Sequence, residues 1–299
     1  MQNYAPTDVA ALALELLPAI ALGVAGERIA RVAASWPRSL RFVIPVTFSL
    51  FYVVVAGTHH MFSWAWFALY ASVPPIIALL LASAAAVDPE QRGCWQDALI
   101  LLALGLAVDL RWLERAWPAG LAGLGKLLLV DAGLYGFVII RQLRGTGFDF
   151  HFHWSDWKSG LRELAFFAPI VITLGLALGF LHPHAKMPTF SMPLTWVYIF
   201  VFVAVPEELF FRGWVQNLLE RRLVLRLTPG AARRVALVIA SILFGLSHFN
   251  KRSAHFNWRY VLLATIAGLF YGRAWRENRR VPASTITHAT VDAIWSFWF

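Results

Sequence analysis

The feature that most constrains this chain is a series of about ten apolar segments, most of them long enough to cross a lipid bilayer. A spanning helix needs about 17–25 residues. Apolar residues make up 59% of the 299 positions and charged residues only 14%, whereas soluble domains carry about 25% charge. The mean hydropathy is +0.61. The segments are 9–26, 42–57, 61–87, 96–112, 119–140, 164–181, 193–219, 235–249, 258–275 and 282–299. The sequence therefore predicts an all-α, polytopic membrane bundle of about eight to ten transmembrane helices.

The net charge of +9 reflects membrane topology rather than a nucleic-acid partner. Most lysines and arginines fall in alternate loops between the apolar segments, such as the loops 27–41 and 220–234. Basic residues concentrate in cytoplasmic loops of membrane proteins. We therefore expect these loops in the cytoplasm, both chain ends outside and no nucleic-acid partner. The expected location is the bilayer of a cell membrane, the inner membrane of a bacterium.

Charged and titratable residues inside the apolar segments gather in the last third of the chain. Such groups are costly next to hydrocarbon and usually serve a function. On a helix, Glu208 and Arg212 lie one turn apart and can pair, while Glu207 points about 100° away from Glu208. His288 and Asp292 also lie one turn apart on one helix face. The residues gathered in the last third are Glu207, Glu208, Arg212, His248, His288 and Asp292.

Three helices with such polar stripes would form one polar cavity in an apolar wall if they packed together. A carboxylate beside a neutral imidazole activates water as a general base, and a second histidine could stabilise the oxyanion that forms on a carbonyl. The alternative is that the residues are ion pairs that hold helices together. Along straight helices, Glu207 lies midway in its segment and His248 near the outer end. The three stripes therefore meet only if the helices are tilted or broken.

Three sequence motifs in this region resemble one known family. They are Glu207-Glu208-x-x-x-Arg212, Phe244-x-x-x-His248, and His288 followed by a polar residue four positions later. In this order and spacing they resemble the CPBP family of intramembrane proteases, also called the CAAX-protease and bacteriocin-processing family or the Abi family. The resemblance covers residues 193–299. We therefore divide the chain into two regions. Residues 1–163 contain transmembrane helices and an amphipathic cytoplasmic segment at 148–157. Residues 164–299 form a helical catalytic core.

The resemblance implies an endopeptidase that cleaves a membrane-tethered protein or peptide precursor near its carboxyl terminus. It implies that Glu207 and His248 activate the hydrolytic water. Glu208, Arg212 and Phe244 would be supporting residues. His288, with the residue four positions later, would form the oxyanion site.

Asp292 departs from the asparagine that is expected at this position. An ionised carboxylate cannot donate a hydrogen bond to an oxyanion. Asp292 would therefore be protonated, or orient His288, or help to hold a cation. We favour a mechanism without a metal cofactor because the chain has no His-Glu-x-x-His motif. If Zn²⁺ is bound instead, the expected ligands are Glu207, His248, His288 and Asp292.

A transporter that relays protons or ions through buried carboxylates and histidines is the main alternative function. It would be favoured by inverted repeats with broken helices in matching positions. The polar residues of this chain instead fall in one third of the sequence, which favours the peptidase. A haem protein with His248 and His288 as axial ligands would leave Glu207, Glu208 and Arg212 without a role.

Overall fold

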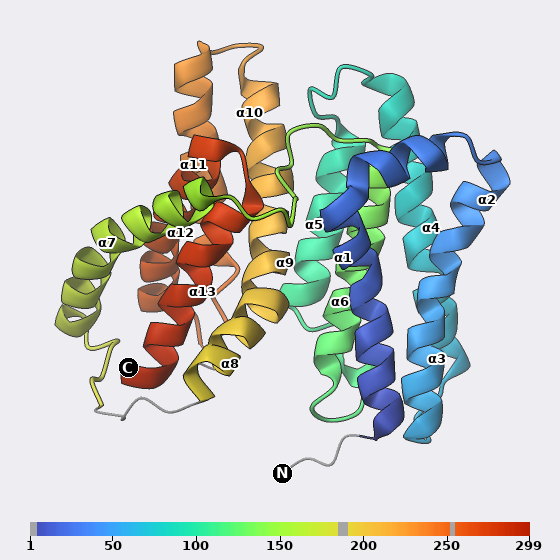
Figure 1. Ribbon diagram of the computed structural model, residues 1–299, viewed down its shortest axis with the longest axis horizontal. Helices are drawn as coiled ribbons and strands as arrows, with labels where there is room; N and C mark the ends of the chain where they lie inside the picture. Colours follow the sequence, from blue (N-terminus) through green and yellow to red (C-terminus); the bar gives the residue numbers. More distant parts are fainter. Residues whose placement is uncertain (1–4, 185–190, 252–254) are drawn as a thin grey trace. The chain divides into compact units, whose positions relative to one another are not determined.

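The structure of the chain is a computed structural model that describes residues 5–184, 191–251 and 255–299. Helix accounts for 79% of it, and no strand occurs among the described residues. The predicted all-α fold is confirmed (Figure 1). Contacts between residues divide the chain into two compact units, Met1–Arg144 and Gly145–Phe299.

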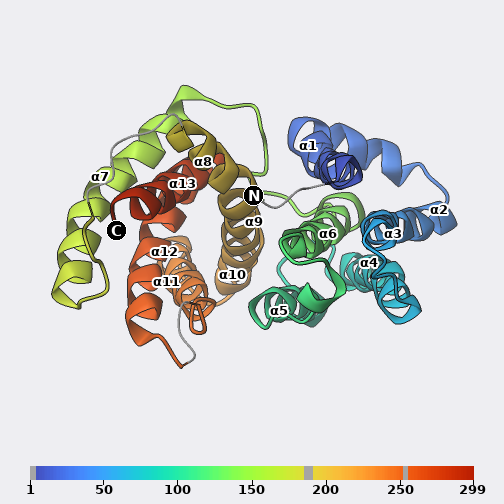
Figure 2. The same cartoon turned by 90° about the horizontal axis from the view of Figure 1, so that it is seen from below.

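The first unit is a bundle in which the α6 region is the most enclosed part. The π-helical turn η3 continues α6, and both pack against α1 and α4 (Figure 2). Leu14 on α1 and Ile76 on α4 expose about half of their surface, as expected of side chains that face lipid. The helices of this unit are α1 (Pro6–Ala34), α2 (Arg38–Val43), η1 (Ile44–Phe48), α3 (Ser49–Thr58), α4 (Trp64–Val87), α5 (Trp95–Asp109), η2 (Glu114–Ala116), α6 (Ala122–Leu134) and η3 (Tyr135–Ile140).

A buried ion-pair cluster closes one end of this unit. Arg141 Nη2 lies 2.6 Å from Asp88 Oδ2, and Arg141 Nε lies 3.1 Å from Asp97 Oδ1. Cys94 Sγ donates to Asp97 at 3.2 Å. Asp88, Cys94 and Asp97 are close enough together to hold a metal ion. However, the Arg141 guanidinium already donates hydrogen bonds to both carboxylates, so the cluster is explained as a structural ion-pair network.

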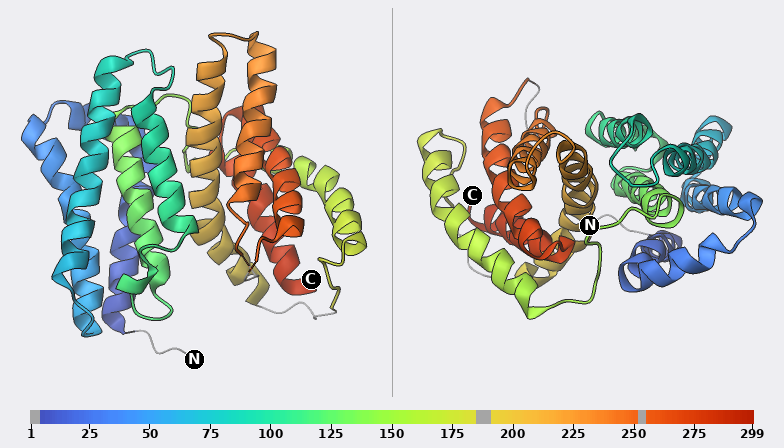
Figure 3. Two further views of the ribbon diagram at one scale, coloured as in Figure 1. Left: turned by 180° about the vertical axis from the view of Figure 1, so that it is seen from behind. Right: turned by 90° about the horizontal axis from the view of Figure 1, so that it is seen from above.

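The second unit contains the three motifs. Its helices are α7 (Trp154–Ala177), α8 (Ser191–Ile199), η4 (Phe200–Ala204), α9 (Val205–Glu208), η5 (Leu209–Gln216), α10 (Asn217–Leu223), α11 (Pro229–Leu246), α12 (Trp258–Asn278) and α13 (Val281–Trp298). The elements from α8 to α10 form one continuous helix, Ser191–Leu223, visible as a single column in Figure 3. Two stretches of it, η4 and η5, are π-helical and flank the glutamate pair. π-Helical turns occur frequently at functional sites.

Within the part of the chain that the structure describes, seven helical segments are long and apolar enough to cross a membrane. The helices α5, α12 and α13 form where segments were predicted but are not among the seven, and α5 has only 15 residues. The seven segments are Pro6–Ala34, Arg38–Thr58, Trp64–Val87, Ala122–Ile140, Trp154–Ala177, Ser191–Leu223 and Pro229–Leu246. The chain is an integral membrane protein, and the side on which each loop lies stays a prediction.

Helix α7 belongs entirely to the second unit. It packs along α12 and α13 (Figures 1 and 2). Its first turn is tied to the start of α13 by Arg280, whose Nε lies 2.9 Å from the buried Asp156 and whose Nη1 lies 2.7 Å from Asp149. The division predicted between residues 163 and 164 falls inside this helix, whereas the contacts change between Arg144 and Gly145. Whether the two units are separate domains stays a prediction.

Gly245 allows α11 and α12 to approach closely just before His248. A Cβ atom at this position would lie 1.9 Å from Thr265 Oγ1 and 2.6 Å from the Val261 carbonyl oxygen. The Thr265 hydroxyl is itself held by a hydrogen bond to that carbonyl at 2.7 Å. No side chain fits here unless the two helices separate.

Replacing Gly245 by alanine should therefore destabilise the second unit. Overpacking typically costs about 1–3 kcal/mol, so we expect a lower unfolding temperature in thermal denaturation of the detergent-solubilised protein. Gly230→Ala, on the same helix, is the control, because a Cβ there meets only the flexible Arg234 side chain at 3.9 Å. Equal unfolding temperatures for the two variants would contradict the close approach.

Candidate active site

The buried carboxylate of Glu208 links two helices of the second unit. Its Oε2 accepts a hydrogen bond from Arg212 Nε at 3.0 Å, and its Oε1 accepts one from His288 Nδ1 at 2.9 Å. Glu208 and Arg212 are fully buried, and the His288 side chain is only 3% exposed. The predicted Glu208–Arg212 pair is thus present. The bond to His288 connects α9 to α13, and the sequence did not indicate it.

His288 is held in a fixed orientation by its surroundings. The Tyr271 ring stacks on the imidazole with centroids 4.7 Å apart, and the Phe244 ring meets it edge-on at 5.6 Å. Because Nδ1 is bonded to Glu208, Nε2 is the nitrogen that faces the remaining carboxylates. It lies 3.6 Å from Asp292 Oδ2 and 3.9 Å from Glu207 Oε2. The predicted one-turn contact between His288 and Asp292 is present.

His248 lies in the turn that follows α11 rather than inside the helix. Its Nδ1 lies 2.8 Å from the Phe244 carbonyl oxygen, which can only accept a hydrogen bond. Nδ1 is therefore the donor, and a neutral ring keeps its lone pair on Nε2. That nitrogen lies 3.4 Å from Lys251 Nζ, which in turn lies 3.6 Å from Glu207 Oε1. The same ammonium group thus adjoins both residues expected to activate water.

The predicted residues therefore come together in one place. The mismatch in depth between Glu207 and His248 disappears because α11 ends before His248 and because π-helical turns flank Glu207. Glu207 and Asp292 keep 25% and 32% of their side chains exposed, in contrast to the fully buried Glu208. The two adjacent glutamates thus occupy different environments, as a division into one structural and one reactive carboxylate requires.

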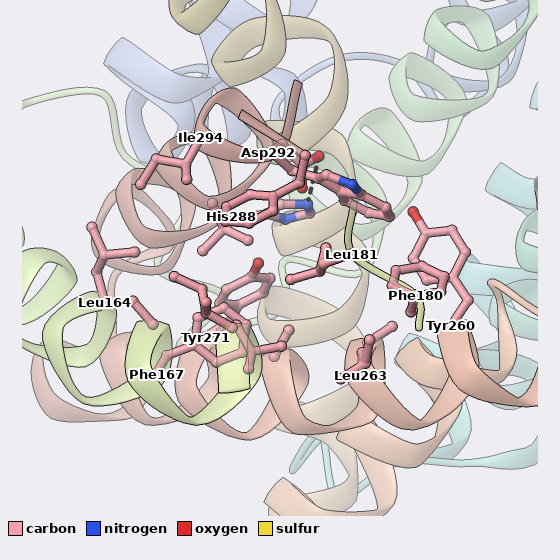
Figure 4. A pocket seen from close by; sticks show the side chains of 18 of the residues that line it. Leu164, Phe167, Phe180, Leu181, Tyr260, Leu263, Tyr271, His288, Asp292 and Ile294 are labelled. Carbon is pink, nitrogen blue, oxygen red and sulfur yellow. Dashed lines mark ion pairs between the residues drawn. The ribbon is translucent and has the colours of Figure 1, made fainter. Parts of the chain in front are cut away.

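A mainly apolar pocket of about 90 Å³ adjoins these groups. Three aromatic side chains pack against one another in its wall: Phe180 in the loop after α7, Tyr260 on α12 and Trp295 on α13. His248, His288 and Asp292 also line it, and Figure 4 shows His288 and Asp292 together beside Tyr271. A site of this kind can hold an apolar group next to polar catalytic groups.

The proposed metal ligands do not fit a metal ion in this arrangement. Among the described residues, Glu207, His248, His288 and Asp292 do not bring three donor atoms within 4.8 Å of one another. The Lys251 ammonium, a cation, lies between His248 and Glu207. With the Lys251 ammonium in this position, a metal ion at the same place would face strong repulsion.

Three residues of the site were missed at the sequence level. Tyr271 stacks on His288, Tyr260 packs against His248 at 4.8 Å, and Lys251 contacts both His248 and Glu207. The two tyrosines lie in α12, within the predicted segment 258–275, where aromatic residues are ordinary. Lys251 follows His248 by three residues, a spacing that places two residues on one side of a helical turn.

Removing the Arg212 side chain should destabilise the protein as well as the site. Removing one member of a buried ion pair typically costs about 3–5 kcal/mol, since the remaining charge is left without its partner. We expect less folded Arg212→Ala protein and a lower unfolding temperature. The control is Arg233→Ala, because the Arg233 side chain is 56% exposed and exposed pairs contribute little. Normal yield and stability of Arg212→Ala would mean that Arg212 acts on the substrate instead.

Comparison with known proteins agrees with the motifs. Residues 188–294, about a third of the chain, match the family model described as type II CAAX prenyl endopeptidase Rce1-like. No curated protein and no solved structure matches the chain. The match confirms the resemblance found in the sequence and favours a protease over a transporter. The carboxyl-terminal part of this chain is therefore similar to the Rce1-like members of the CPBP, or CAAX protease, family.

Proposed function

We propose that this protein is an intramembrane endopeptidase that hydrolyses a membrane-tethered protein or peptide near its carboxyl terminus. The observation that carries the proposal is the bond from Glu208 to His288. It holds His288 Nε2 beside Glu207 and Asp292, next to an apolar pocket, within the segment that matches the protease family.

Glu207 and His248 are assigned as the groups that activate water. A water bound between Glu207 Oε1 and His248 Nε2 can lose a proton to one of them as its oxygen attacks the peptide carbonyl carbon. The Phe244 carbonyl fixes the His248 ring so that Nε2 is the accepting atom. The proton then passes to the amine as the carbon–nitrogen bond breaks.

His288 is assigned as the donor to the oxyanion. The carboxylate of Glu208 accepts from Nδ1, and Glu207 and Asp292 surround Nε2. These negative groups favour a proton on Nε2, and an N–H group held there can donate to the developing oxyanion. Asp292 then acts by orienting and charging His288, which is one of the three roles left open by the sequence.

The apolar pocket and the family name together suggest the substrate. The pocket of about 90 Å³ would accept a small apolar side chain next to the scissile bond, and the matching family is described as a prenyl endopeptidase. We expect cleavage of peptides that carry a lipid anchor. The expected membrane is the cell membrane of a bacterium.

Replacing Glu207 by glutamine should abolish cleavage without affecting folding. The amide keeps the size of the side chain but cannot take a proton from water, and general-base catalysis typically contributes about 10²–10⁴-fold. The measurement is hydrolysis of a library of lipid-tethered fluorogenic peptides with variable carboxyl-terminal residues. A Glu207→Gln protein with near-normal turnover would refute the assignment.

Changing Asp292 to asparagine tests the metal-independent mechanism. The amide oxygen can still accept from His288 Nε2, so we expect Asp292→Asn to keep much of the activity and to be unaffected by a chelator. Asp292→Ala should lose about 10²–10³-fold, the usual effect of disturbing an oxyanion site. Loss of activity when the unmutated protein is treated with chelator, with recovery on adding Zn²⁺, would show that a metal takes part.

A further inference from the structure

The ammonium group of Lys251 occupies the place between the two groups that are assigned to activate water. Its Nζ lies 3.4 Å from His248 Nε2 and 3.6 Å from Glu207 Oε1. Since His248 Nδ1 is hydrogen-bonded to the Phe244 carbonyl oxygen, Nε2 is the atom that must accept the proton of water. A Lys251 N–H directed at this lone pair competes with water for it. The arrangement thus corresponds to a resting site.

The backbone of Lys251 is fixed while its side chain can move. Its amide nitrogen donates to the His248 carbonyl at 3.2 Å, and its carbonyl oxygen accepts from Asn257 Nδ2 at 3.3 Å. The side chain is 36% exposed. Four rotatable methylene groups allow the ammonium to swing several ångströms without any change in the backbone.

An anionic group near the scissile bond would draw this ammonium away. No lysine or arginine is among the described residues that line the apolar pocket, and the Arg212 guanidinium is fully buried against Glu208. Lys251 is therefore the cation best placed to meet a negative charge brought by a ligand. A substrate cleaved near its end presents one such charge close to the scissile bond, its terminal carboxylate. Charge-assisted hydrogen bonds of this kind are among the strongest in proteins.

We propose that Lys251 gates the site: it covers His248 and Glu207 in the resting protein and is displaced when it pairs with the carboxyl-terminal carboxylate of the substrate. This inference rests on the proposed peptidase function. It makes Lys251 a specificity-determining residue that selects peptides with a free carboxyl terminus close to the cleaved bond. The ammonium keeps its proton throughout, so no additional proton transfer is required.

The test compares the best-cleaved library peptide with its carboxyl-terminal amide. The unmutated protein should prefer the acid by about tenfold or more in kcat/KM, because only the acid offers a charge-assisted bond. Lys251→Met removes the charge but keeps the length of the side chain. It should cleave the amide faster than the unmutated protein does and should lose most of the preference for the acid. Lys158→Met, at an exposed position of α7, is the control and should leave both rates unchanged.

A second measurement does not depend on proteolysis. Diethyl pyrocarbonate reacts with the unprotonated imidazole nitrogen, so Lys251→Met should raise the rate of His248 modification several-fold, as read by peptide mass spectrometry. The exposed His151 serves as the internal reference. Three results with Lys251→Met would overturn the gate. They are an unchanged rate of His248 modification, an unchanged ratio of kcat/KM for the acid and amide peptides, or slower cleavage of both peptides than by the unmutated protein. If the unmutated protein cleaves no peptide, the proposed function fails, while the modification rate still reports whether Lys251 covers His248.

Discussion

The site depends on one buried carboxylate with two partners. Glu208 is fully buried and bonds to Arg212 on its own helix and to His288 on α13. A lone charge at this position would be strongly unfavourable, and each partner offsets part of the cost of removing it from water. The same bonds fix the positions of the neighbouring groups. Because Glu208 takes the structural role, the adjacent Glu207 can stay partly exposed beside His288 and Lys251.

The irregular parts of the helices are as important as the regular parts. The π-helical turns on both sides of the glutamate pair and the end of α11 before His248 bring together residues that straight helices would keep at different depths. Gly245 allows α11 and α12 to meet closely just before that end. The resting position of Lys251 follows from the same turn, since its amide bonds to the His248 carbonyl. One local interruption of a helix thus supplies both a water-activating group and the residue that covers it.

Much of this arrangement follows from residue patterns. Hydropathy predicts the helices, and the one-turn spacings predict the contacts of Glu208 with Arg212 and of His288 with Asp292. The Glu208–His288 bond could not be predicted, because it joins residues 80 positions apart and depends on how α13 is rotated. π-Helical turns have no clear sequence signal. Lys251 follows an apolar segment, and nothing in the sequence indicates its contact with Glu207, which lies 44 positions earlier. The division of contacts at Arg144 depends on side-chain packing, which hydropathy does not describe.

The central claim is that this cavity hydrolyses a peptide bond by direct attack of water. It is tested most directly by single-turnover cleavage of a lipid-tethered peptide in ¹⁸O-labelled water, with both fragments analysed by mass spectrometry. The account predicts one ¹⁸O atom in the new carboxylate of the amino-terminal fragment and no covalent adduct on the protein. Trapping of an acyl-enzyme adduct, or failure of the folded protein to cleave any member of the peptide library, would contradict it.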